Sequence, residues 1–134
     1  MDLTAINWIA AVVAAVSAFV LGGVWYGPIF GKQWQGLVGL SDDDLQNGRH
    51  PAATFGCAFV LTLVQAVFLA AIIPTGSGIG GGIGQALLIG IAFVATAFGV
   101  NYLFSRHPAS LWGIDAGYNV VQFAIMGAII GAFG

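Results

Sequence analysis

Residues Arg106–Phe133 read RHPASLWGIDAGYNVVQFAIMGAIIGAF, a basic corner followed by a long apolar run. The run from Ser110 to Phe133 has the roughly 20 residues that a helix needs to cross the hydrocarbon core of a bilayer. It is continuous rather than alternating, and about twice as long as a barrel strand, which excludes a transmembrane β-strand. The stretch therefore predicts a transmembrane helix.

Three other stretches have the same character: Ala5–Gly27, Ala52–Ile73 and Ile83–Phe104. Of the 134 residues, 59% are hydrophobic and only 6% are charged, whereas a soluble domain carries about 25% charged residues. The first run is not a signal peptide, because no basic residue precedes it and it is too long. The chain is predicted to be one all-α membrane domain, residues 1–134, with four transmembrane helices.

The basic corner occurs twice, at Arg49–Ala52 and at Arg106–Ala109. Aligning the two copies lays Gln65 on Gln122, and a weaker alignment of the preceding helices lays Tyr26 on Tyr102. We interpret this as a duplicated helical hairpin, with repeats at 1–75 and 83–134 and a loop inserted at about 28–48. Two hairpins repeated in parallel are related by a pseudo-two-fold axis along the membrane normal.

The few cations predict the orientation of the chain. Lys32 and Arg49 lie between the first and second helices, and Arg106 lies between the third and fourth. The positive-inside rule places these two connections in the cytoplasm. Both termini are then expected to face outward.

The corners themselves have two interpretations. Proline suits the first position of a helix, arginine reaches lipid phosphates, and tryptophan favours the membrane interface. This interpretation makes interfacial anchors of Arg49, Arg106, His50, His107 and Trp112. The alternative is that the two histidines form a symmetric proton or metal site, but two histidines alone are a weak signal. We therefore predict no metal.

The inserted loop and the outward turn contain two further motifs. Ser41 can cap a short helix, with Asp44 completing a weak capping box. Asp42–Asp44 suggest a divalent metal, but no further oxygen-ligand spacing follows, so a solvated helix start is preferred. Gly76–Gly81 match G-x-G-x-x-G in a turn between membrane helices, without the strand or acidic residue of a dinucleotide site. We interpret these glycines as a tight turn.

Polar residues interrupt the predicted spans on single helix faces. They are Asp115, Tyr118, Asn119 and Gln122 on the fourth helix, Thr62 and Gln65 on the second, and Asn101 on the third. Polar groups that face lipid are unfavourable, so we expect them to point inward or toward another subunit. They either join the helices by hydrogen bonds or line a path open to the cytoplasm. Asp115, the only acidic residue in a predicted span, discriminates between the two.

Small residues form two lines that allow helices to approach closely. One comprises Ala14, Ala18 and Gly22, and the other comprises Gly127 and Gly131. The approach can be within one chain or between chains. Because four short helices enclose little volume, a pore would require a homo-oligomer.

The block GGVWYGPIFGKQW at Gly22–Trp34 contains the motif W-Y-G-P-x-F-G-x-x-W. Together with NYLF at Asn101–Phe104, DAGY at Asp115–Tyr118 and GAIIGAF at Gly127–Phe133, it resembles a family of small bacterial integral membrane proteins. That family is catalogued as a conserved domain of unknown function. The resemblance covers nearly the whole chain. It implies a bacterial four-helix membrane protein, and it implies no activity or site residues. We therefore expect the chain in the bacterial inner membrane, where the orientation predicted from the cations makes both termini periplasmic.

These observations favour a non-enzymatic, oligomeric membrane protein without a cofactor. We expect it to bind or pass a small solute or ion at the polar face of the second and fourth helices. The alternative is an accessory or scaffold subunit of a larger membrane complex. A lipid enzyme is third, because no nucleophile–base pair or metal-ligand spacing supports it. The expected partners are the lipid bilayer and either further copies of the chain or a membrane complex, and nucleic acid is not among them.

Overall fold

The computed structural model describes residues 3–41, 43–44 and 51–133, leaving aside the side chain of Pro51. The described residues form helices and turns without strands. Four helical segments are long and apolar enough to cross a membrane: Trp8–Ile29, Ala52–Ile72, Gly78–Phe104 and Ala109–Phe133. The predicted set of four apolar helices is confirmed. Arg49 and His50 lie outside the described residues.

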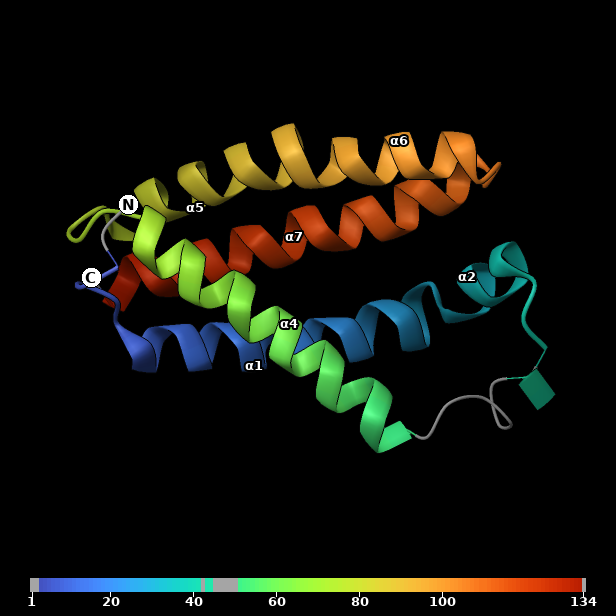
Figure 1. The fold of residues 1–134 in the computed structure, drawn as a ribbon, viewed down its shortest axis with the longest axis horizontal. Helices are drawn as coiled ribbons and strands as arrows, with labels where there is room; N and C mark the ends of the chain where they lie inside the picture. The colour runs from blue at the N-terminus through green and yellow to red at the C-terminus, as the bar shows by residue number, and fades with distance from the viewer. Residues whose placement is uncertain (1–2, 42, 45–50, 134) are drawn as a thin grey trace.

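The chain runs up and down through the bundle (Figure 1). Its elements are α1 (Trp8–Val24), η1 (Trp25–Ile29), α2 (Gly31–Val38), α4 (Pro51–Ile72), α5 (Gly78–Ile89), η2 (Gly90–Ala95), α6 (Thr96–Phe104) and α7 (Ala109–Phe133). The two η elements are π-helical turns inside longer helices. The start of α1, the α4–α5 turn and the end of α7 lie at one end, which we call the outer end; α2 and the α6–α7 turn lie at the other, the α2 end.

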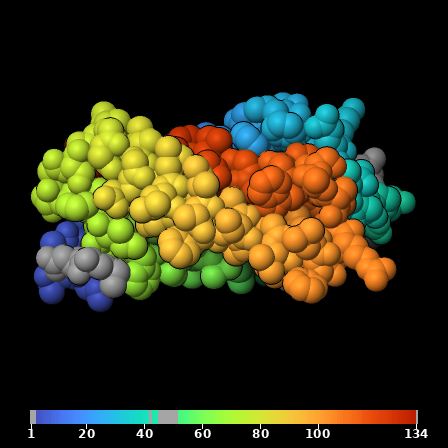
Figure 2. All heavy atoms as spheres, turned by 90° about the horizontal axis from the view of Figure 1, so that it is seen from above, coloured from blue at the N-terminus to red at the C-terminus, as the bar shows by residue number. Residues whose placement is uncertain are grey.

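Helix α7 is the central element. It lies between α1 and the α5–α6 segment (Figure 2). Within the most apolar stretch of each span, 44% of the residues of α7 are buried, against 17–28% in the other three. The remaining helices expose large apolar side chains over much of their surface, as expected for helices that face lipid.

Glycines bring α5 and α7 into direct backbone contact. A Cβ atom added to Gly82 would overlap the carbonyl oxygen of Gly127, and one added to Gly131 would overlap that of Gly78. Helix α5 begins at Gly78, so the predicted start of the third span at Ile83 was too late in the chain. Only the first glycines of the G-x-G-x-x-G match form the turn, with Gly76 and Gly78 at positive φ.

Helix α1 contributes a face of alanines to the core. Ala10, Ala11, Ala14, Ala15 and Ala18 are completely buried where α1 packs against α4 and α7. The predicted line of small residues at Ala14 and Ala18 is therefore used within one chain. It is not available as a contact surface for a second protein in this conformation.

The helix starts follow capping chemistry. Pro108 lies just before α7, and its carbonyl accepts hydrogen bonds from the backbone N–H groups of Leu111 and Trp112. It therefore caps the helix instead of being its first residue, whereas α4 does begin at Pro51. The capping box is confirmed: the Ser41 N–H donates to Asp44 Oδ2 at 2.9 Å, and the Asp44 N–H donates to Ser41 Oγ at 3.1 Å.

Candidate functional site

A buried carboxylate joins three helical segments near the α2 end. Asp115 is 7% exposed. The hydroxyl of Tyr26, from η1, donates to Asp115 Oδ1 at 2.6 Å, and the hydroxyl of Tyr102, from α6, donates to Oδ2. Each carboxylate oxygen thus has one phenolic partner. We call these three residues the Asp115 cluster.

The π-helical turn η1 aims Tyr26 and its neighbour at α7. Pro28 has no N–H and removes one regular helical hydrogen bond, and the Phe30 N–H instead reaches back five residues to the carbonyl of Trp25 at 2.8 Å. The Trp25 indole N–H donates to the Ile114 carbonyl at 3.0 Å. A Cβ atom at Gly31 would lie 2.5 Å from the Tyr26 carbonyl oxygen, so glycine is required here. The motif residues around Pro28 therefore build one side of the site.

The second π-helical turn, η2, precedes the segment that carries Tyr102. At its end, the Ala95 carbonyl accepts a hydrogen bond from the indole N–H of Trp112 at 2.9 Å. Trp112 remains 39% exposed, but its polar atom is used between α7 and η2. This predicted interfacial anchor thus also joins two helices near the Asp115 cluster.

Aromatic rings surround the cluster. Tyr118 packs against Tyr26 and Trp25, with ring centroids 5.2 and 6.4 Å apart, and its hydroxyl donates to the Ala18 carbonyl at 3.1 Å. Trp34 of α2 lies 5.8 Å from Tyr26, and Phe30 lies 4.9 Å from Trp25. These rings form an aromatic wall between α1, α2 and α7.

A second polar contact lies about two helical turns farther along α7. The Gln122 side-chain amide donates to Gln65 Oε1 at 3.0 Å, and Gln122 is 3% exposed. The two glutamines that the alignment pairs thus face each other. Thr62 and Asn119 instead bond within their own helices, to the carbonyls of Ala58 and Asp115, both at 2.8 Å. They contribute no interhelical bond that the structure records.

The remaining predicted residues lie at the edge of the site or away from it. Asn101 is exposed in the single chain, so it does not point into the bundle, and the other alternative, that it faces another subunit, stays a prediction. Arg106 is exposed and adopts φ +61° in the α6–α7 turn. His107 is exposed, with its ring 5.1 Å from that of Tyr102.

Tyr26 and Tyr102 were not among the predicted site residues. A signal for them was present, because the weaker alignment lays one on the other. The two tyrosines that this alignment pairs both donate hydrogen bonds to Asp115. The alignment gave no reason to connect them with Asp115, which lies on a third helix.

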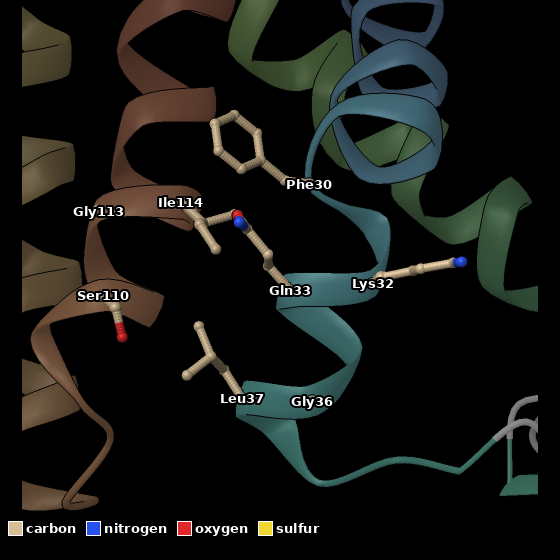
Figure 3. Close-up of a pocket in the computed structure, with 8 residues that line it drawn as sticks. All are labelled: Phe30, Lys32, Gln33, Gly36, Leu37, Ser110, Gly113 and Ile114. Carbon is tan, nitrogen blue, oxygen red and sulfur yellow. The ribbon is translucent and has the colours of Figure 1, made fainter.

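An open groove of about 640 Å³ adjoins the cluster, between α2 and the first turns of α7. Its lining is mostly apolar and consists of Phe30, Lys32, Gln33, Gly36, Leu37, Ser110, Gly113 and Ile114. Figure 3 shows Phe30, Gln33 and Leu37 directed toward α7, and the Lys32 side chain directed away from it. Two lining residues connect the groove to the cluster: Ile114 precedes Asp115, and Phe30 packs on Trp25.

The chemistry available is that of one carboxylic acid and several phenols. Over the described ranges, no three His, Cys, Asp or Glu side chains are grouped so as to hold a metal ion. The partners recorded for the Asp115 carboxylate are hydroxyl groups rather than cations. Such a group can bind a proton or pair with one positive charge.

No curated protein and no solved structure matches this sequence. A family model does match, over residues 9–131, which cover nearly all of the four apolar helices and every residue of the Asp115 cluster. The chain therefore belongs to the family described as "Protein of unknown function (DUF1761)".

Proposed function

We propose that the protein binds a small solute or ion inside the membrane and passes it across, with the Asp115 cluster as the binding site. The observation that carries this proposal is the buried carboxylate, held by two tyrosine hydroxyls from two other helical segments. An ionisable residue within a membrane span is unfavourable unless it faces protein or water, and such residues commonly mark ion or substrate pathways.

The distribution of polar groups supports access from one side. From Ser110 in the groove, polar side chains continue along α7 through Asp115 to the Gln122–Gln65 pair. Beyond that pair, Met126 and Ile130 pack among alanines with almost no exposure. This arrangement favours a gated carrier over an open pore within one chain. A pore would require further copies of the chain.

The orientation predicted from the cations determines which side of the membrane the groove faces. Lys32 on α2 and Arg106 in the α6–α7 turn lie at the α2 end, which the positive-inside rule assigns to the cytoplasm. In the bacterial inner membrane, the groove would open to the cytoplasm and both termini would be periplasmic. The accessory-subunit alternative is less favoured, because the alanine surface proposed for partner contact is buried.

Flux measurements on reconstituted protein test the proposal. Purified protein in liposomes is assayed with an internal pH-sensitive dye and with ion-selective electrodes, against gradients of H⁺, Na⁺, K⁺ and tetramethylammonium, so that electroneutral exchange is detected as well. We expect at least one gradient to drive flux of protons or of the cation in the wild type, reduced tenfold or more in Asp115→Asn. Asp43→Asn, an exposed carboxylate in the inserted loop, is the matched control and should retain wild-type flux. Equal flux in Asp115→Asn, or none for any cation, would contradict the proposal.

A further inference from the structure

The cluster and its surroundings specify the class of ligand. We propose that the site takes a lipophilic organic monocation in exchange for a proton on Asp115; this inference rests on the proposed function and names its substrate. Three independent features support it: the charge of the cluster, the chemistry of its walls and the shape of the groove beside it.

The charge of the cluster fits one positive charge. A carboxylate in an apolar span is unfavourable unless it is protonated or paired. The titratable groups that face it are Tyr26 from η1, Tyr102 from α6 and Tyr118 on α7, with His107 beyond Tyr102. When Asp115 is protonated, it donates one of its two tyrosine bonds and accepts the other. When it is ionised without a ligand, it can accept both; in the complex, a bound monocation takes the place of one tyrosine and neutralises the carboxylate.

The walls favour an organic cation over a hard metal ion. A small metal cation requires several oxygen ligands at close range. Three nearby backbone carbonyls already accept hydrogen bonds: Ile114 from Trp25, Asp115 from Asn119, and Ala18 from Tyr118. The cluster also packs against the aromatic rings of Trp34 and Tyr118, and Trp25 packs on Tyr118. Aromatic rings attract cations through their negative faces and are the usual recognition element for quaternary ammonium groups.

The groove has the size and character of an entrance for such a ligand. Its volume of about 640 Å³ falls within the range of about 300–1,000 Å³ for small-molecule sites. Phe30, Leu37 and Ile114 give it an apolar lining, and Phe30 leads to Trp25 and thus to the cluster. The Lys32 side chain is directed away from α7 (Figure 3), which weakens the repulsion between its ammonium and a cation that enters the groove.

Binding exchanges one proton on Asp115 for one cation. The protonated Asp115 releases its proton to water and the carboxylate pairs with the incoming cation, so one proton leaves for each cation bound. Tyr26 is displaced from Oδ1 to admit the ligand. The segment that carries it is the π-helical turn η1, which lacks regular helical hydrogen bonding at Pro28.

Calorimetry on the full-length protein in detergent, with tetraphenylphosphonium as the probe, tests this inference. We expect saturable binding that weakens as the pH is lowered. Titrations in buffers of different ionisation enthalpy should show release of about one proton per cation. Asp115→Asn should abolish binding, whereas Asp115→Glu should retain proton-linked binding. Trp25→Leu should weaken binding about tenfold, and Trp8→Leu, an exposed tryptophan at the outer end, should leave it unchanged.

The uncharged analogue triphenylphosphine oxide and the cation Na⁺ separate the outcomes. If triphenylphosphine oxide binds as tightly as tetraphenylphosphonium, the groove selects for hydrophobicity alone and the inference is wrong. If Asp115-dependent flux of H⁺ or Na⁺ is found without tetraphenylphosphonium binding, the inference fails while the proposed function stands. If neither appears, both fail. Circular dichroism and gel filtration test whether Asp115→Asn is folded, so that a loss of binding is not mistaken for a loss of structure.

Discussion

The two halves of α7 are held by opposite means. From Ala109 to Gln122, the helix contacts its neighbours through long side chains with polar atoms: a carboxylate, three tyrosines, two tryptophans and a glutamine pair. From Phe123 to Phe133, it contacts α5 through Gly127 and Gly131, with backbone against backbone. One half depends on specific hydrogen bonds, and the other on the absence of side chains.

The difference implies different mobility. Backbone contact between two helices leaves nothing that can rotate out of the way, so the glycine half resists rearrangement. Side-chain hydrogen bonds can exchange partners while the helices remain in place. We therefore expect any conformational change to occur in the polar half, around η1 and α2, while α5 and the outer half of α7 move as one unit.

The largest effect is expected from a substitution that disrupts the backbone contact in the glycine half of α7. Gly82→Leu places a side chain against the Gly127 backbone, which cannot yield, so we expect it to destabilise the protein by about 3 kcal/mol or more. The control is Gly84→Leu on the same helix, where an added Cβ meets nothing within 4 Å. Unfolding by sodium dodecyl sulfate in mixed micelles measures both. Equal loss in the two variants would show that the close contact does not hold α5 to α7.

A smaller effect is expected in the polar half. Asp115→Leu leaves the hydroxyls of Tyr26 and Tyr102 without their acceptor. Both tyrosines are only partly buried, so we expect the two together to destabilise the protein by about 1–3 kcal/mol, the range for one buried unpaired group. Adding Tyr26→Phe and Tyr102→Phe to this variant should recover much of the loss, because no buried hydroxyl then lacks a partner. The same unfolding titration measures both variants. No recovery would mean that the carboxylate is held by contacts other than these two.

The glutamine pair lies at the boundary between the halves and allows a double-mutant cycle. Gln65→Leu, Gln122→Leu and the double variant should give a coupling free energy of about 0.6 kcal/mol, typical of interhelical hydrogen bonds in membranes. Thr62→Val is the control, because the Thr62 hydroxyl bonds within its own helix. A coupling free energy of zero between the glutamines would show that their hydrogen bond does not help to hold α4 to α7.

The smallest effect is expected outside both halves, in the inserted loop. The Ser41 backbone N–H and hydroxyl hold the pKa of Asp44 below its usual value of 3.8. A lowered pKa in the folded state stabilises the capping box above pH 3.8, and this stabilisation is lost as the pH falls through the lowered pKa. Carbon-detected NMR titration of Asp44 measures it. Ser41→Ala removes the hydroxyl but keeps the backbone N–H, which is the larger cause, so the pKa should rise only part of the way to its usual value. An unchanged pKa would refute the contribution of the hydroxyl.

Much of the architecture was predictable from local properties of the sequence. Four apolar runs long enough to span a bilayer predict four helices, because a backbone in lipid must satisfy its own hydrogen bonds. Ser41 and Asp44 predict a capping box because its partners are three residues apart. Alignment of the two basic corners paired Gln65 with Gln122, which are bonded in the structure. The duplication and its symmetry axis remain predictions.

Tertiary structure decided which polar groups meet, because that depends on helix rotation and on turns that depart from α-helical geometry. Helical periodicity placed Asp115, Tyr118, Asn119 and Gln122 on one face, but it could not foresee that two π-helical turns reorient the segments beside them. Those turns bring Trp25, Tyr26 and Tyr102 to α7, whereas Asn101, one residue before Tyr102, is left on the outside. The sequence determined a bundle of apolar helices with a carboxyl group inside it, and packing determined which side chains that carboxyl group meets.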